Sequence, residues 1–311
     1  MIFVSAEEVA RLLPYEECIP LMRGAMIALS EGRTRQLLRA ILDLPEGRAF
    51  GSMPGAMPDD GVFGAKLVSV YPENFAKGIS SHQGVVALFD GETGAPTAML
   101  DASEITAIRT AAASAAATDA LARADAAHLA ILGYGEQAER HVEAVRCVRR
   151  IERLTVWGRD PAKAAGFAEH FGGTACGSVE EAVADADIIC TVTASPEPIL
   201  PSRWVADGAH INAVGSSRAG PVEIDNDLVA RARFFADHEE GVRAQGAEYL
   251  YALEAGAIGP EHLLGEIGEV FAGTLPGRLS DADVTIYKSL GSIVQDLASA
   301  RHIVAKLRAN E

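Results

Sequence analysis

Hydrophobic and polar residues follow two different patterns along the chain, and each pattern predicts its own kind of structure. In the first third, short apolar runs bounded by turn residues predict strands at residues 40–44, 64–70 and 85–90. Gly91-Glu92-Thr93-Gly94 predicts a turn, and residues 95–100 predict the strand that returns from it. This part of the chain is therefore expected to contain a hairpin and further strands.

Three helices are predicted in the same part of the chain. Ser5 followed by Glu8 resembles a capping box, which marks the start of a short helix. Residues 19–30 are helical in pattern, and Gly32 ends that helix. The alanine-rich stretch at residues 105–123 has strong helix propensity and small side chains. We expect this helix to pack tightly and to link two halves of the molecule.

From residue 127 onward, predicted strands and helices alternate. Apolar runs predict strands at residues 127–132, 154–157, 186–192, 210–214 and 233–236. Alternation of this kind implies a parallel sheet with helices on both faces, an α/β fold. After residue 287 the apolar positions fall on one face of a helix. This last helix is expected to leave the parallel sheet and to pack on the N-terminal half.

The predicted strand at residues 127–132 is followed by Gly133-Tyr134-Gly135-Glu136-Gln137-Ala138 and then by a helical segment. Gly133 allows a tight turn, and Gly135 lets the backbone approach a pyrophosphate. Ala138 is small enough for close packing of helix on sheet, and the start of the helix offers free N–H groups to an anion. Strand, glycine-rich turn and helix in this order predict a dinucleotide-binding site.

The end of the second strand of such a fold bears on the choice of cofactor. An acid there usually binds the ribose of NAD, whereas a basic residue accommodates the additional phosphate of NADP. Here Gly158 stands where the acid would be, and Arg159 follows it. The sequence therefore favours NADP(H). Asp160 is a predicted helix cap, but it could still reach a ribose, so NAD(H) stays open.

Composition and charge exclude several classes of partner. The chain has 311 residues and a formal net charge of −16, which disfavours binding to nucleic acid or to an anionic membrane. No apolar run is long enough for a transmembrane helix, and the N-terminus does not resemble a signal peptide. The four cysteines are scattered without metal-ligand spacing, so we expect no metal site and a reducing, cytoplasmic location.

Three isolated cations of the N-terminal half are candidates for binding a substrate. Arg39, Lys66 and Arg109 each lie in an apolar or glycine-rich segment. A charge in such surroundings is costly unless it is paired or faces a polar cleft. Each one alone is more often part of a structural ion pair than a ligand-binding group, so the trio requires further support.

That support comes from an ordered set of segments that resembles the ornithine cyclodeaminase and mu-crystallin family. The set spans about residues 39 to 297 and is more specific than any single motif. It consists of Gly64-Ala65-Lys66, Ser80-Ser81-His82-Gln83-Gly84, Thr106-Ala107-Ile108-Arg109-Thr110-Ala111-Ala112, Gly133-Tyr134-Gly135-Glu136-Gln137-Ala138, Ala186-Asp187-Ile188-Ile189-Cys190-Thr191, Asn212-Ala213-Val214-Gly215 and Lys288-Ser289-Leu290-Gly291.

The resemblance implies a homodimer with two domains in each chain. Residues 1–112 and 295–311 would form an α+β domain that binds substrate and dimerises, completed by the C-terminal helix. Residues 113–294 would form a Rossmann domain, a doubly wound parallel sheet that binds the nicotinamide cofactor. The substrate residues implied are Arg39, Lys66, Arg109, Ser217 and Leu290. The cofactor residues implied are Ser81, Arg109, Gly133, Gly135, Glu136, Gln137, Ala138, Arg159, Thr193, Val214, Gly215, Ser216, Ser217 and Ser289.

One position departs from the family pattern and bears on the reaction. In the cyclodeaminases and the related alanine dehydrogenases, the Asn-Ala-Val strand leads to an aspartate that binds or deprotonates the substrate amine. Ser217 takes that place here. A serine hydroxyl carries no resident negative charge and is no base near neutral pH without an activator. The serine version resembles mu-crystallin-like ketimine reductases and bacterial pyrroline-2-carboxylate reductases, whose substrates are already imines.

The resemblance therefore implies an enzyme, an NADPH- or NADH-dependent oxidoreductase. It would reduce Δ1-pyrroline-2-carboxylate or Δ1-piperideine-2-carboxylate at C2 to L-proline or L-pipecolate. Arg39 and Arg109 would hold the carboxylate, because arginine forks match carboxylates. Lys66 would keep the imine nitrogen protonated. His82 is a second proton candidate, and it is equally well explained as a hydrogen-bonded loop histidine.

Three alternatives stay open at this point. An ornithine cyclodeaminase would release ammonia from ornithine, and an alanine dehydrogenase would reduce NAD with an amino acid. Ser217 argues against both, although another group could transfer the proton. A crystallin-like protein that binds NADP and a ligand without turnover belongs to a different class. The three cations in one chain favour catalysis over binding alone.

Overall fold

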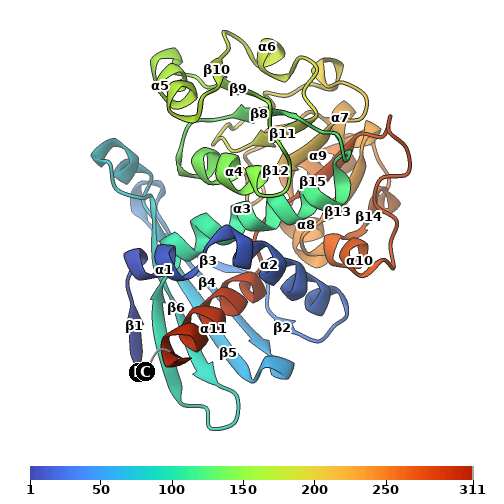
Figure 1. Cartoon of the computed structure of the whole chain (residues 1–311). Helices are drawn as coiled ribbons and strands as arrows, with labels where there is room; N and C mark the ends of the chain where they lie inside the picture. Colours follow the sequence, from blue (N-terminus) through green and yellow to red (C-terminus); the bar gives the residue numbers. More distant parts are fainter. Residues whose placement is uncertain (310–311) are drawn as a thin grey trace. The chain divides into compact units, whose positions relative to one another are not determined.

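The computed structural model describes residues 1–309, which divide into two compact units. The first unit contains residues 1–109 and the C-terminal segment from Ser292, and the second contains residues 110–291. The division at 109/110 falls inside the alanine-rich helix, and the second division is at 291/292. The division made from the sequence is at 112/113 and 294/295. Each unit contains one sheet (Figure 1).

The sheet of the first unit has seven strands in the order β1-β7-β6-β5-β4-β2, and β3 also pairs with β4. All neighbours are antiparallel except β1, which runs parallel to β7. The strands are β1 (Ile2–Val4), β2 (Arg35–Gln36), β3 (Ala40–Asp43), β4 (Ala49–Met57), β5 (Val62–Val70), β6 (His82–Asp90) and β7 (Pro96–Asp101). The predicted hairpin is confirmed as β6 and β7.

Helices cover one face of this sheet, which we call the inner face. They are α1 (Ala6–Leu12), α2 (Tyr15–Ser30), the first part of α3 (Ala102–Leu121) and α11 (Ile293–Ala309). The C-terminal helix α11 packs on β4, β5, β6 and α2. Gly55 and Gly64 permit the close approach of α11, because a Cβ at Gly55 would lie 2.5 Å from Ile293 Cγ2 and one at Gly64 3.1 Å from Leu297 Cδ2.

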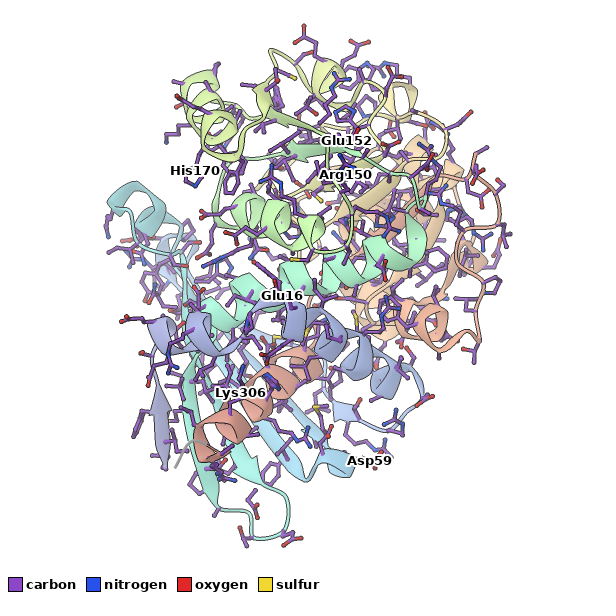
Figure 2. The ribbon with its side chains drawn as sticks, viewed as in Figure 1. Glu16, Asp59, Arg150, Glu152, His170 and Lys306 are labelled. Atoms are coloured by element: carbon purple, nitrogen blue, oxygen red, sulfur yellow. The ribbon has the colours of Figure 1, made fainter. Side chains whose placement is uncertain are left out.

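Polar contacts also attach α11 to α2. Lys306, which is labelled in Figure 2, lies on α11. Its Nζ lies 2.8 Å from Glu17 Oε2 and donates to the Leu12 carbonyl at 3.1 Å. At the other end of the chain, the predicted capping box is confirmed. Ser5 and Glu8 each accept a hydrogen bond from the other residue's backbone N–H, which fixes the start of α1.

The opposite face of the sheet, here called the outer face, is apolar. Side chains alternate between the faces of a strand, so Lys66 on β5 is inward and its neighbours Ala65 and Leu67 are outward. Phe63 lies on the outer face and stacks on Phe89 with ring centroids 5.3 Å apart. Large exposed apolar side chains on this face are Phe3, Leu42, Phe50, Phe63 and Leu67.

The sheet of the second unit is entirely parallel, with eight strands in the order β10-β9-β8-β11-β12-β15-β13-β14. The strands are β8 (His128–Leu132), β9 (Arg153–Trp157), β10 (Thr174–Ala175), β11 (Ile188–Thr191), β12 (His210–Ala213), β13 (Arg233–Ala236), β14 (Leu263–Glu266) and β15 (Thr285–Lys288). The helices are α4 (Glu136–Arg146), α5 (Pro161–Phe171), α6 (Val179–Val183), α7 (Asn226–Arg231), α8 (Glu239–Gln245), α9 (Ala247–Glu254) and α10 (Ile267–Ala272).

Alternate residues of β8 enter two separate hydrophobic cores. Leu129 and Ile131 pack with α4 and α5, whereas Ala130 and Leu132 pack with α6, α7, α8 and α9. Both faces of the sheet are therefore covered by helices, which confirms the predicted doubly wound α/β fold. Within residues 1–309, no helix has the length and apolar character required to cross a bilayer.

Six strands within residues 1–309 were not predicted from the sequence: β1, β2, β10 and β14 lie at sheet edges, and β4 and β15 lie inside their sheets. Strand β4 contains Gly51, Pro54 and Gly55, which read as turn residues rather than strand residues. Pro54 is tolerated because it lies opposite residues 37–39, where the pairing of β4 passes from β3 to β2. Strand β15 was also not predicted, because its four residues overlap the start of the amphipathic C-terminal segment at residue 287. It inserts between β12 and β13.

Candidate functional site

The glycine-rich turn after β8 has the geometry that a dinucleotide site requires. Gly133 has φ +134°, and a Cβ there would lie 3.0 Å from the Val192 carbonyl oxygen, so only glycine fits without strain. Gly135 is the N-cap of α4, and no atom lies within 4 Å of the position its Cβ would take. No side chain caps α4. The start of the helix thus offers N–H groups to an anion.

This turn lies at the point where the order of the strands reverses. From β8 the chain continues to β9 and β10 on one side, while β11 and β12 lie on the other. Ligands of doubly wound folds bind at the carboxyl ends of the strands at such a point. Ala138 is buried against the sheet as predicted. Gln137 Oε1 is buried without a hydrogen-bond partner among residues 1–309, and so is Ser289 Oγ. Two unsatisfied polar atoms fit a site that binds a polar cofactor.

At the end of β9, the second strand of the parallel sheet along the chain, Gly158 stands at the position where an acid would bind ribose. A Cβ at Gly158 would lie 2.1 Å from Tyr134 Cδ1, so the tyrosine ring occupies the space of a side chain there. Asp160 Oδ1 accepts hydrogen bonds from Ala162 N (3.0 Å) and Lys163 N (3.2 Å). Asp160 is therefore the N-cap of α5, as predicted. Arg159 is exposed.

A buried carboxylate that the sequence analysis missed connects two of the expected cofactor residues. Glu223 accepts hydrogen bonds from Thr193 N (2.6 Å), Thr193 Oγ1 (2.7 Å), Gly215 N (2.8 Å) and Thr191 Oγ1 (2.7 Å). Burial raises the pKa of Glu223, and its hydrogen bonds with the two threonines oppose this rise. The signal available in the sequence was a single acid between Val222 and Ile224.

The other expected residues of the second unit lie in turns that follow β12 and β15. Ser216 is buried and its hydroxyl donates to the Arg218 carbonyl at 2.8 Å, whereas Ser217 is half-buried. Leu290 N and Gly291 N both donate to Asp237 Oδ2, at 2.7 and 2.6 Å. The side chain of Leu290 belongs to the hydrophobic core of this unit.

In the first unit, the structure brings Lys66 and Arg109 together around a carboxylate. Asp296 Oδ1 on α11 lies 3.1 Å from Arg109 Nε and 3.5 Å from Lys66 Nζ. Lys66 Nζ also donates to Thr106 Oγ1 at 2.6 Å, and Arg109 donates to Gln295 Oε1 at 2.8 Å. The three charged side chains are buried. Asp296 Oδ2 has no hydrogen-bond partner within residues 1–309.

Arg39 and His82 lie within electrostatic reach of this cluster. Arg39 is half-buried, and it precedes β3 in the interruption between β2 and β3. Burial lowers the pKa of Lys66 to about 8; Asp296 acts against this, while Arg109 and Arg39 add to it. Burial and the charges of Lys66 and Arg39 lower the pKa of His82. These effects bring the pKa of Lys66 close to neutrality and favour the neutral form of the His82 ring.

His82 has the contacts of a hydrogen-bonded histidine at a strand end. Its Nδ1 lies 3.0 Å from Ser81 Oγ, and its carbonyl accepts a hydrogen bond from Ser103 Oγ at 2.5 Å. Asp296 was missed because it stands in an amphipathic helix, where it is one of several polar positions. Its burial depends on β5 and α3, which are distant in sequence.

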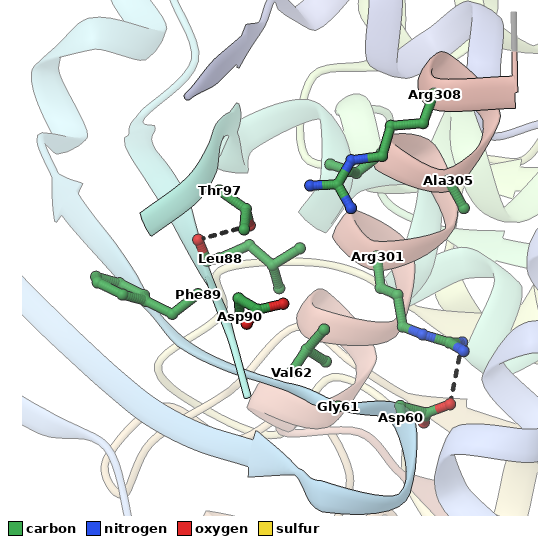
Figure 3. Close-up of a pocket in the computed structure, with 11 residues that line it drawn as sticks. Asp60, Gly61, Val62, Leu88, Phe89, Asp90, Thr97, Arg301, Ala305 and Arg308 are labelled. Atoms are coloured by element: carbon green, nitrogen blue, oxygen red, sulfur yellow. Dashed lines mark hydrogen bonds and ion pairs between the residues drawn. The ribbon is translucent and has the colours of Figure 1, made fainter. Parts of the chain in front are cut away.

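A surface pocket of about 230 Å³ lies elsewhere in the first unit (Figure 3). The pocket is lined by the Val62 end of β5 and by α11. His82 lies at the other end of β5, where it pairs with Val70. Within the pocket, Arg301 is already paired with Asp60 at 3.0 Å. The pocket therefore does not contain the cluster around Lys66, and we assign it no part in the reaction.

Replacing Asp296 by asparagine removes the negative charge that forms ion pairs with Lys66 and Arg109. Buried cations without compensation are costly, so we expect Asp296→Asn to lower the free energy of unfolding by about 3–5 kcal/mol. Urea unfolding measures this loss. Asp60→Asn is the matched control, because it breaks an exposed pair with Arg301 worth about 1 kcal/mol or less. Equal losses in the two variants would contradict the role of Asp296.

Comparisons with known proteins agree with this geometry. The family described as "Ornithine cyclodeaminase/mu-crystallin family" matches residues 1–311. The ketimine reductase mu-crystallin of Mus musculus is 37% identical over 306 residues, covering 96% of this chain and 95% of that protein.

Two solved structures each cover 100% of this chain. The Δ1-pyrroline-2-carboxylate reductase of Thermococcus litoralis, in complex with NADH and L-proline, has a TM-score of 0.96 and 32% identity and is covered over 98% of its chain. An archaeal alanine dehydrogenase dimer with bound NAD has a TM-score of 0.93 and 31% identity and is covered over 97%. The chain belongs to the ornithine cyclodeaminase/mu-crystallin family.

Proposed function

We propose that this protein is an NAD(P)H-dependent reductase of a cyclic imino acid, Δ1-pyrroline-2-carboxylate or Δ1-piperideine-2-carboxylate, which it converts to L-proline or L-pipecolate. The observation that carries the proposal is the buried cluster of Lys66, Arg109 and Asp296. It combines a guanidinium that matches a carboxylate with an ammonium that can hold a proton. A relative named as a ketimine reductase and a similar structure that holds NADH and L-proline support the same reaction.

The residues of the chain have separate tasks in this reaction. Bound NAD(P)H supplies a hydride to C2 of the protonated imine. Arg109 and Arg39 hold the carboxylate and so fix which face of the imine is presented, mainly a positioning effect. Lys66 keeps the imine nitrogen protonated, so that C2 is electron-poor and the product nitrogen is a neutral amine at the moment it forms. His82, neutral at pH 7, is a weaker candidate for this task.

Ser217 distinguishes this proposal from the other activities of the family. An amine substrate has to lose a proton before its C–H bond gives up a hydride, and a serine without an activating base cannot accept that proton near neutral pH. An imine substrate needs no such base. Turnover of ornithine with ammonia release would favour a cyclodeaminase, and reduction of NAD by alanine would favour a dehydrogenase. Tight ligand binding without turnover would favour a binding protein.

The deciding experiment is oxidation of NADPH or NADH by the purified protein with Δ1-pyrroline-2-carboxylate, followed at 340 nm. Oxidation that depends on the imino acid and yields L-proline supports the proposal. Absence of oxidation with this substrate and with Δ1-piperideine-2-carboxylate, for either cofactor, would refute it. Ornithine and alanine serve as comparison substrates for the two alternatives.

The rate of imine reduction is expected to fall as the pH rises through about 8. The pKa of Lys66 is lowered to about 8 by burial, so above that pH the free enzyme loses the proton that Lys66 holds. The kcat/KM profile reports this ionisation. Lys66→Met should reduce kcat on the order of 100-fold to 10,000-fold and remove this limb of the profile. A limb that persists in the variant would belong to the imine itself.

We propose that NADP(H) is preferred over NAD(H). Arg159 is exposed next to Gly158, where no acid fits beside the Tyr134 ring. Arg159→Ala should therefore raise the KM for NADPH about tenfold, the effect of losing about 1.4 kcal/mol of phosphate binding, and leave that for NADH unchanged. Lys163→Ala is a control at a neighbouring cation. An equal rise for both cofactors would argue against recognition of the phosphate.

We also propose that two copies of the chain associate through the outer face of the first unit's sheet. Exposed aromatic and aliphatic side chains in one patch are typical of an interface. Phe63→Asp should convert a dimer into a monomer or an unstable protein, measured by light scattering after size-exclusion chromatography. Leu279→Asp, an exposed apolar position of the second unit, is the control and should leave the dimer intact. A monomeric wild-type protein would contradict this proposal.

A further inference from the structure

Two buried ionisable side chains hold the turn formed by residues 214–217, which follows β12. Glu223 Oε2 accepts a hydrogen bond from Gly215 N at 2.8 Å. Lys288 Nζ donates to the Ser216 carbonyl oxygen at 2.8 Å. Both side chains are fully buried. Consecutive residues of one turn are thus bound by an anion and by a cation, neither of which takes part in the proposed reaction.

Glu223 holds more than the turn itself. Each of its oxygens accepts one backbone N–H, from Thr193 for Oε1 and from Gly215 for Oε2. The turn packs directly on this carboxylate, since a Cβ at Gly215 would lie 2.5 Å from Glu223 Cδ and 2.1 Å from the Thr193 carbonyl oxygen. Glu223 therefore ties the segment after β11 to the turn after β12, at the carboxyl edge of the sheet.

Lys288 belongs to a buried ion pair. The contribution of this pair to stability does not explain why a lysine stands at this position. Lys288 Nζ lies 2.7 Å from Glu248 Oε2, and both side chains are fully buried. Removing two charges from water is expensive, and replacing such a pair by apolar side chains of similar volume is often neutral or stabilising. An apolar pair could not donate a hydrogen bond to Ser216. That bond is the property that requires a lysine at this position.

We infer that Lys288 and Glu223 are positioning residues, which fix the 214–217 turn in the conformation that hydride transfer from the nicotinamide cofactor requires. This inference rests on the proposed function and on the cofactor contacts that the family resemblance implies for residues 214–217. Glu248 acts only through Lys288, by compensating its charge. The carboxylate and the ammonium each satisfy a backbone group of the turn that would otherwise be less constrained.

The double variant Lys288→Met/Glu248→Met tests the inference by removing both members of the ion pair, while Glu223 loses the nearby charge of Lys288 and keeps its four hydrogen bonds. Its thermal stability should equal or exceed that of the wild type. We expect kcat to fall on the order of 100-fold, because a misplacement of about 1 Å has an effect of that size. KM for the imino acid should change little, and the isotope effect with C4-deuterated cofactor should rise as hydride transfer becomes more rate-limiting.

Glu248→Gln is the matched control. It removes the ion pair but leaves Lys288 free to donate to Ser216, so it should be less stable than the double variant and yet retain kcat within a factor of about three. Wild-type kcat and isotope effect in the double variant would overturn the inference. A loss of kcat in Glu248→Gln equal to that of the double variant would also overturn it, because stability rather than the bond to Ser216 would then be responsible.

Hydrogen exchange separates a failure of this inference from a failure of the proposed function. In Glu223→Gln, a side-chain amide cannot accept from both Thr193 N and Gly215 N. The Gly215 amide keeps its second acceptor, the Thr191 carbonyl oxygen at 3.1 Å, and should exchange up to about tenfold faster, at most about 1.4 kcal/mol of lost protection. Thr191→Val, which removes only a hydroxyl donor to the same carboxylate, is the control.

If the wild type reduces no imino acid, the proposed function fails. Faster exchange together with weaker NADH binding would still support positioning of the turn for the cofactor, and unchanged exchange would overturn it.

Discussion

A carboxylate buried between two cations determines how the first unit is put together. Lys66 comes from β5, Arg109 from α3 and Asp296 from α11, so strand, central helix and C-terminal helix meet at one charge cluster. Each cation alone would be too costly to bury, and the carboxylate alone would be as well. Together they are tolerated, which attaches the last helix of the chain to a sheet formed by its first hundred residues. The same cluster leaves Lys66 with a pKa of about 8, which suits a group that holds a proton near neutral pH.

In the second unit, buried carboxylates are compensated by backbone N–H groups. Turns at the carboxyl edge of a parallel sheet contain N–H groups that need acceptors. Glu223 accepts from Thr193 N and from Gly215 N, which also donates to the Thr191 carbonyl of β11, and Asp237 accepts from Leu290 N and Gly291 N. Buried acids thereby order the turns on which a cofactor site of this fold depends. These buried acids have hydrogen-bond partners, as buried polar groups require.

Much of the fold follows from local pattern, and the exceptions have identifiable causes. Several strands of the parallel sheet were predictable because they are continuous apolar runs between turn residues, as for β8. Strand β4 was missed because Pro54 and Gly55 resemble a turn, and only the gap between β2 and β3 makes the proline acceptable. Lys66 and Arg109 could be selected as charges in apolar segments. Their partner could not, because nothing near Asp296 in the sequence indicates which residues it would face.

The sequence by itself determined the dinucleotide turn, since Gly133 and Gly135 are contiguous with a strand and a helix and their backbone requirements are local. It also determined that the position of Ser217 carries no acid. Only the tertiary structure decided that the Tyr134 ring fills the space beside Gly158, that Asp296 joins the two cations and that Glu223 joins two turns. These contacts connect residues from 8 to 230 positions apart. They exist only once burial has removed water as the alternative partner.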